Sequence, residues 1–139
     1  MGNNDNMAEW VCREHTKGSI DRAGALLIPW WIGKDRPEDL GTLFGIVENW
    51  RTSHSYPLNA FQNNLRFRAK RIENTALIAQ LLKRFSSVMD ELTREPNMKL
   101  SQMHDLGGCR AIMSSIQSVD ELFNLYGRSL VSGKVLCKN

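Results

Sequence analysis

Cysteine is scarce in this sequence, and long hydrophobic runs are absent from it. The three cysteines, Cys12, Cys109 and Cys137, form no C-x-x-C pair and are odd in number. This pattern argues against a disulfide framework and against a zinc site, and it favours a reducing compartment. No apolar run approaches the ~18 residues of a membrane span, and the polar, acidic first ten residues do not resemble a signal peptide. We therefore expect a cytoplasmic protein with no membrane partner.

Repeats, low-complexity tracts and obvious linkers are also missing. The 139 residues allow one modest domain with its own hydrophobic core. The formal charge of +3 and the pI near 8.9 suit an anionic partner such as a nucleotide or RNA. His15, His54 and His104 share no metal-ligand spacing. Composition therefore predicts a mildly basic globular domain without a structural metal.

The first half of the chain has the apolar spacing of helices. We predict three helices, over residues 19–27, 37–50 and 57–72. Ser19 is suited to be the N-cap of the first helix, and Asp21 would lie in its first turn. Pro37 and Pro57 suit the first turns of the other two. Residues 1–18 are expected to be a loose lead-in, and Pro29 to end the first helix, with the following tryptophan pair packed against a neighbouring helix.

Residues 76–92 allow two interpretations. Seven apolar residues repeat with the 3.6-residue period of a single amphipathic helix: Leu77, Ile78, Leu81, Phe85, Val88, Met89 and Leu92. Four polar residues would share its opposite face: Lys83, Ser87, Asp90 and Arg94. The alternative is a strand followed by a helix, with Leu77, Ala79, Leu81 and Lys83 on one face of the strand.

The segment MKLSQMHDLGGCRAIMS, residues 98–114, combines a lone acid with a predicted strand. Asp105 precedes a Gly-Gly pair, and a short apolar run containing Arg110 follows. This order predicts a turn that leads into a strand over 106–114. A carboxylate at the end of a strand can bind Mg²⁺, which takes its remaining ligands from water and phosphate. A plain turn residue is the structural alternative for Asp105.

Three blocks of the chain resemble the RelA/SpoT-type (p)ppGpp synthetase domain, in particular its small single-domain branch that includes toxic members. The blocks are SIDRAGALL, NWRTSHSYPLN and QLLKRFSSVMDELTREPNMKLSQMHDLGGCRAI. The resemblance implies an α/β (α+β) fold, with a helical part over 19–75 and an incomplete, nucleotidyltransferase-like catalytic part over 76–139. It also favours the second interpretation of 76–92, with a strand to about Arg84 and a helix from Ser87. A short helix over 119–125 and a ragged third strand at Val131, Val135 and Leu136 complete the expected elements.

The resemblance also implies a reaction and a set of site residues. The family transfers pyrophosphate from ATP to the 3′-hydroxyl of GDP or GTP, or to the 3′ end of tRNA in some toxic members, with Mg²⁺. Carried over by position, the ATP-contacting residues are Lys83, Arg84, Ser87, Arg94 and Arg110. Asp105 matches the catalytic, magnesium-binding acid. Arg110 has a structural alternative as the ion-pair partner of Asp105.

Three departures from the family pattern predict an incomplete, inactive form. Leu81 replaces the first arginine of an Arg-x-Lys-Arg block, and Glu91 stands where the family usually has a lysine. A leucine cannot make the bidentate contact of a guanidinium with phosphate. The chain stops soon after Tyr126, before the family's acceptor-binding segment, so we expect an open sheet edge. That edge predicts a homo-oligomer or pairing with a complementary fragment. A regulatory fragment that docks on a full-length synthetase and a non-enzymatic RNA- or protein-binding module remain as alternatives.

The departures predict that these 139 residues alone transfer no pyrophosphate. Incubation with labelled ATP, Mg²⁺ and GDP, GTP or tRNA should leave all three acceptors unlabelled, because Leu81 weakens the donor site and the acceptor-binding segment is missing. Labelled product that disappears in an Asp105→Ala variant would contradict this expectation.

Overall fold

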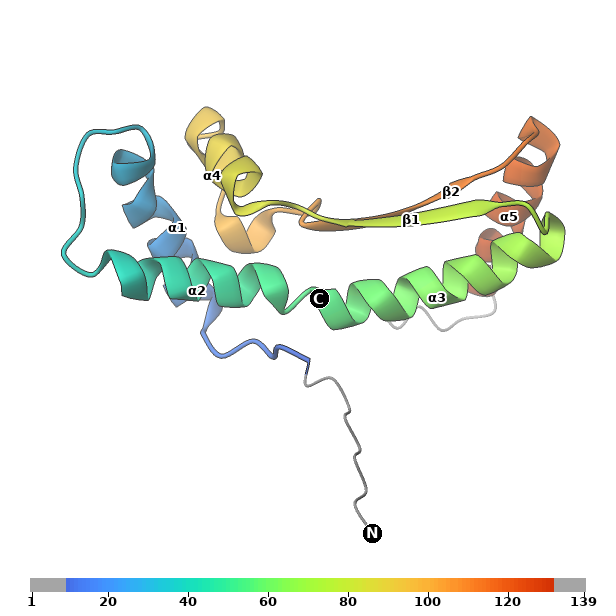
Figure 1. The fold of residues 1–139 in the computed structure, drawn as a ribbon, viewed down its shortest axis with the longest axis horizontal. Coiled ribbons are helices and arrows are strands. Elements are labelled where there is room, and N and C mark those ends of the chain that lie inside the picture. The colour runs from blue at the N-terminus through green and yellow to red at the C-terminus, as the bar shows by residue number, and fades with distance from the viewer. Residues whose placement is uncertain (1–9, 132–139) are drawn as a thin grey trace, which may run out of the picture. The chain divides into compact units, whose positions relative to one another are not determined.

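The structure, a computed structural model, describes residues 10–131 of the chain. In chain order its elements are α1 (Lys17–Trp31), α2 (Leu40–Thr52), α3 (Ser55–Ile72), β1 (Leu77–Leu82), α4 (Phe85–Arg94), the 3₁₀ helix η1 (Leu100–Gln102), β2 (Gly107–Ile112) and α5 (Ile116–Val131) (Figure 1). The two strands form one antiparallel sheet. The expected mixture of helices and strands is thereby confirmed. Nowhere in residues 10–131 is a helix both long and apolar enough to cross a membrane.

The chain divides into two compact units. The described residues of the first unit are 10–58 and 81–108, and those of the second unit are 59–80 and 109–131. Each unit combines helices with a segment of both strands. Each also has its own group of buried apolar side chains, so the two are described separately below.

The core of the first unit is formed where α1 contacts α2, α4 and η1. Its fully buried larger side chains are Ile20, Leu27, Val47, Val88, Met89, Leu100 and Leu106. The buried Ile20, Ala23 and Leu27 are three or four positions apart on one face of α1, and Val88, Met89 and Leu92 lie together on one face of α4. Gly24 allows a close approach of α1, since a Cβ there would lie 3.2 Å from Leu92 and 3.3 Å from Leu100.

The first helix is longer at both ends than the sequence predicted. Thr16, not Ser19, is the N-cap, and its hydroxyl accepts a hydrogen bond from the Ser19 N–H at 3.2 Å. Asp21 therefore lies beyond the first turn, where its carboxylate accepts hydrogen bonds from the N–H and hydroxyl of Ser101 at 2.7 and 3.0 Å. Pro29 lies inside α1 instead of ending it, and the chain turns at Gly33, with φ 78°.

The two residues of α1 that follow Pro29 are tryptophans whose indole rings are partly buried. Trp30 and Trp31 pack against the core of the first unit, which confirms the predicted role of this pair. The second helix begins at Leu40 and not at Pro37, while Pro57 does lie in the first turn of α3. Pro57 thus predicts the start of α3 to within two residues, whereas Pro37 lies three residues before α2.

The segment 76–92 forms a strand and a helix, so the single-helix interpretation is wrong. Backbone pairing decides this: β1 is hydrogen-bonded to β2, and just beyond it the Lys83 N–H donates to the Leu106 carbonyl at 2.7 Å. The helix begins at Phe85, two residues before the expected start at Ser87, with Arg84 at the N-cap. Leu81 is 68% exposed, so it is not a core residue of the first unit.

The second unit packs α3 and α5 around four buried residues, Leu65, Ala69, Ala76 and Leu122. The helix predicted over 119–125 is longer, and runs from Ile116 to Val131. Val131 therefore belongs to a helix and not to a third strand, and Val135 and Leu136 lie outside the described residues.

The second unit also exposes large apolar side chains: Phe67, Leu77, Ile112, Ile116 and Phe123. Such a surface suits a partner, and the expected oligomer stays a prediction.

Glu73 holds together two loops of the second unit. Its carboxylate accepts hydrogen bonds from the Ser114 N–H, at 2.9 Å for Oε2, and from the Ser114 hydroxyl. These bonds lower the pKa of Glu73 below its ordinary value of 4.5, against a small opposing effect of burial. A lowered pKa in the folded state means that the stabilisation is complete above about pH 4.5 and is lost as the pH falls through the lowered pKa.

We predict that Glu73→Gln lowers the melting temperature at pH 7 and that its difference from the wild type shrinks towards pH 3. The reason is that acid protonates Glu73 in the wild type and removes the same charged acceptor. Thermal melts between pH 7 and pH 3 measure this. Asp120→Asn, which neutralises an exposed acid of the same unit, is the matched control. A difference for Glu73→Gln that is constant with pH would contradict the prediction.

Candidate functional site

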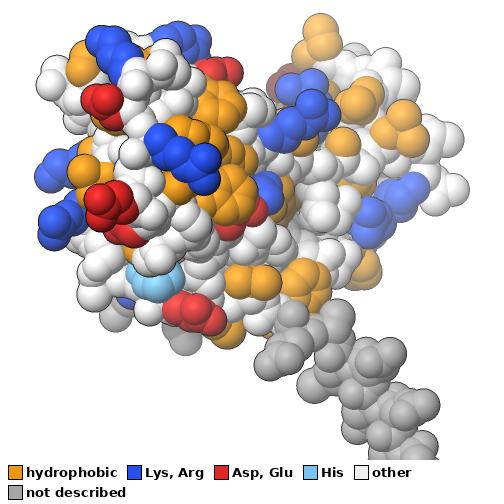
Figure 2. All heavy atoms as spheres, turned by 60° about the vertical axis from the view of Figure 1, so that its left-hand side comes forward, with side chains coloured by type: hydrophobic (Ala, Val, Ile, Leu, Met, Phe, Trp, Pro, Cys, Tyr) orange, Lys and Arg blue, Asp and Glu red, His pale blue; other side chains and the backbone are white. Residues whose placement is uncertain are grey.

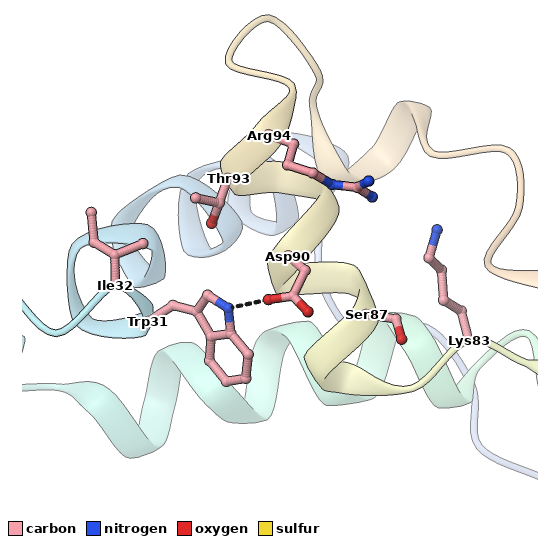
Figure 3. Close-up of a pocket in the computed structure, with 7 residues that line it drawn as sticks. All are labelled: Trp31, Ile32, Lys83, Ser87, Asp90, Thr93 and Arg94. Atoms are coloured by element: carbon pink, nitrogen blue, oxygen red, sulfur yellow. Dashed lines mark hydrogen bonds between the residues drawn. The ribbon is translucent and has the colours of Figure 1, made fainter.

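A hollow of about 590 Å³ lies in the first unit between the end of α1 and one face of α4. Its lining residues are Trp31, Ile32, Lys83, Ser87, Asp90, Thr93 and Arg94 (Figure 3). Of the residues from α4, Ser87, Asp90 and Arg94 are three or four positions apart, so they share one helical face. Lys83 comes from the junction of β1 and α4, and the last turn of α1 supplies the aromatic wall.

Trp31 connects that wall to α4. Its indole Nε1–H donates a hydrogen bond to Asp90 Oδ1 at 2.8 Å, as Figure 3 shows. The ring also meets Phe85 edge-on, with 6.0 Å between centroids. The last turn of α1 is thereby held against the first half of α4. The pocket consequently has a rigid apolar side, while Lys83 and Arg94 extend into its other side (Figure 3).

Every polar group of Lys83 has a partner within the first unit. Its N–H is bound to Leu106, and its carbonyl accepts from Arg51 Nη1 at 3.3 Å. Its ammonium donates to the carboxylates of Glu91 and Asp105, the latter at 2.8 Å. The Lys83 and Glu91 side chains are only 16% and 15% exposed, whereas Asp105 is 66% exposed. The backbone of Lys83 is therefore fixed by Arg51 and Leu106, and its ammonium faces two negative charges.

Asp105 is charged at neutral pH. The hydrogen bond from Lys83 lowers the pKa of this carboxyl below its ordinary value of 3.8, although desolvation acts in the opposite direction. A carboxylate that is mostly exposed and already ionised can accept a divalent cation without first losing a proton. Among residues 10–131, however, no three His, Cys, Asp or Glu side chains are grouped as a ready metal site. Magnesium binding through Asp105 stays a prediction.

The N-terminus of α4 opens beside the pocket. Arg84 is its N-cap, makes no side-chain capping bond, and is exposed. The first turn contains no acid, and Ser87 places a hydroxyl in the pocket. Backbone N–H groups at a helix start and the positive end of the helix dipole both favour an anion. Lys83 and Arg84 lie at this helix start and Arg94 in the last turn of the same helix, so the pocket, which Asp90 also lines, offers cations to a phosphate group.

The structure brings together most of the residues predicted from the sequence. Lys83, Ser87 and Arg94 line one pocket, Arg84 caps the helix beside it, and Asp105 is bound to Lys83. Arg110 is exposed on β2 in the second unit, so both of its predicted roles stay predictions.

Four lining residues were missed as site residues: Trp31, Ile32, Asp90 and Thr93. The signal for Asp90 was present, because it shares the polar face with Lys83, Ser87 and Arg94. No local pattern points to Trp31 or Ile32. They reach the pocket through the packing of α1 on α4, which joins residues about sixty positions apart.

Compared with known proteins, the sequence matches no protein-family model and shows no significant similarity to a curated protein. Membership of the RelA/SpoT-type synthetases therefore stays a prediction from the sequence.

Proposed function

We propose that the pocket binds the phosphates of ATP, as the donor site of a RelA/SpoT-type pyrophosphate transferase. One observation carries the proposal: Lys83, Ser87 and Arg94 line a single pocket beside the start of α4. These are residues that the family resemblance assigns to ATP by their position in the sequence. Their convergence is what a donor site requires.

The chemistry of the pocket suits this ligand. Phosphoryl and pyrophosphoryl transfer depend on positioning and on neutralising phosphate charge, which cations and helix N-termini provide. Mg²⁺ bound to the phosphates would be accepted by the exposed carboxylate of Asp105. The acceptor, GDP or GTP or the 3′ end of tRNA, follows from the resemblance alone, as does a cytoplasmic location.

Two features of the pocket predict weak binding. Leu81 stands at the sequence position of the family's first arginine, and its exposed side chain offers no hydrogen-bond donor. Lys83 already faces two carboxylates. A lost charge-assisted hydrogen bond of roughly 1.5–3 kcal/mol corresponds to about ten- to a hundred-fold in affinity. ATP binding is thus expected to be measurable but weak, and assisted by Mg²⁺.

Leu81→Arg should tighten ATP binding by about ten-fold or more without unfolding the protein, because the side chain is 68% exposed and a guanidinium adds a phosphate contact. Calorimetric titration with ATP in Mg²⁺ buffer measures the affinity, and a thermal melt checks the fold. Leu77→Arg is the matched control: Leu77 is 65% exposed, lies on the same face of β1 four residues earlier, and should give no gain.

Equal gains from both arginine variants would show general charge attraction and contradict a donor site at Leu81. Absence of ATP binding in the wild type and in Leu81→Arg would refute the proposed function itself. A Lys83→Met variant that binds ATP as well as the wild type would also count against it.

A second candidate function is RNA binding by the second unit. Residues 59–80 and 109–131 contain six Lys and Arg but three Asp and Glu, whereas residues 10–58 and 81–108 contain ten of each. Figure 2 brings forward the side of the molecule that contains α1, α2 and α4, and acidic and basic side chains lie close together on it. The positive charge of the described chain is thus concentrated in one unit, which is typical of a protein that binds a polyanion.

Helix α3 carries most of that charge next to exposed aromatic rings. The stretch 49–72 contains no Asp or Glu, and Arg66, Lys70 and Arg71 are exposed on α3. Arg71 lies over the ring of Phe67, with 5.5 Å from Cζ to the centroid, and Phe67 is 64% exposed. An alternative reason for Lys70 and Arg71 in the last turn of α3 is their favourable interaction with the helix dipole. The dipole does not account for the exposed ring of Phe67 beside them. Cations beside stacking rings are the usual surface for single-stranded RNA.

Replacing Arg66, Lys70 and Arg71 together by Gln should weaken binding of a labelled single-stranded RNA and reduce the slope of log affinity against log salt by about 2. Fluorescence anisotropy measures the affinity for the RNA at salt concentrations from about 50 to about 200 mM, a range over which such slopes are measured. Lys34, Arg36 and Lys99, all exposed in the first unit, replaced together by Gln give the same charge change and should alter binding little. Equal losses in both triple variants would contradict a specific α3 surface.

A further inference from the structure

Phosphate binding would depend on the ammonium of Lys83, and this ammonium already forms an ion pair with the carboxylate of Glu91. Both side chains are about five-sixths buried, and the ammonium also donates to Asp105. The cluster of one lysine and two carboxylates carries a net charge of −1. A phosphate that approaches Lys83 therefore meets two negative charges before it gains a hydrogen bond.

Glu91 and Asp105 differ in how strongly they hold the ammonium. Asp105 is mostly exposed, so water screens its attraction to Lys83. Glu91 is shielded from water together with Lys83, and charges attract more strongly where water is excluded. Glu91 thus makes the larger contribution to holding Lys83 away from an incoming anion.

We propose that Glu91 is an internal competitor for phosphate: its carboxylate takes the place of a ligand anion on Lys83 and sets the affinity of the pocket. This inference rests on the proposed function, since it concerns the same site. It makes Glu91 a residue that determines specificity. A ligand binds through Lys83 only if its phosphates, with or without Mg²⁺, outcompete a shielded carboxylate. Ligand groups that do not reach Lys83 are unaffected by Glu91.

Glu91→Gln tests the proposal, because it keeps the shape of the side chain and removes its charge. Calorimetric titrations with ATP, inorganic tripolyphosphate and adenosine compare the variant with the wild type. We expect about ten-fold tighter binding of ATP and tripolyphosphate and no change for adenosine. Glu95→Gln is the matched control, because Glu95 is an exposed acid one turn further along, and its loss changes the net charge equally. It should leave all three ligands unchanged.

Lys83→Met supplies the second part of the experiment. In that background Glu91→Gln should no longer improve binding of either phosphate ligand, since the cation for which Glu91 competes is gone. A gain of the same size in both backgrounds would overturn the proposal and indicate general electrostatics. If Glu91→Gln does not fold, Glu91→Asp keeps the charge and shortens the side chain. It should then tighten both phosphate ligands by a smaller factor, and the absence of any gain would overturn the proposal.

The outcomes separate this inference from the proposed function. If the wild type and Glu91→Gln bind ATP equally while Lys83→Met weakens it, the donor site stands and the inference fails. If no variant binds ATP but Glu91→Gln tightens tripolyphosphate, the competition stands and the nucleotide function fails. If neither ligand binds any variant, both are refuted.

Discussion

The candidate site depends on the pairing of β1 with β2. Residues 77–92 have the apolar spacing of one helix, yet backbone hydrogen bonds to β2 hold the first part of them as a strand. Only because the strand ends at Leu82 can α4 begin at Phe85, with its N-terminus next to Lys83. If residues 77–92 formed one continuous helix, there would be no helix N-terminus at Phe85. The first backbone N–H groups of α4 would then be hydrogen-bonded within the helix.

Lys83 is the residue at which the elements of the first unit meet. Its backbone N–H is tied to Leu106 before β2, its carbonyl to Arg51 of α2, and its ammonium to Glu91 of α4. Arg51 is itself fixed by Glu48, at 2.9 Å for each of two hydrogen bonds. A cation held at so many points is pre-organised, which favours ligand binding by lowering its entropic cost. Its contacts with the carboxylates of Glu91 and Asp105 also neutralise it, and the two effects oppose each other.

Much of the site could be predicted because its residues are close together in the chain. Lys83, Arg84, Ser87 and Arg94 fall within twelve positions, so an error of two residues in the start of α4 still leaves them on that helix or just before it. Trp31 could not be predicted in the same way. Its bond to Asp90 depends on the packing of α1 on α4, and on α1 extending two residues beyond Pro29. Burial of the indoles outweighed the local preference of proline to end a helix.

The sequence by itself determined the three N-terminal helices, the strand that begins at Gly107 and the set of polar residues around Lys83. Spacing of apolar residues and turn residues are local properties, and they act on each segment separately. Tertiary structure decided the conformation of 77–82, the ends of α1 and α5, and the partner of Lys83. Glu91 lies eight residues after Lys83, on a helix whose direction only the packed core determines. Contacts of this kind depend on which surfaces are buried together, and no single segment of the sequence contains that information.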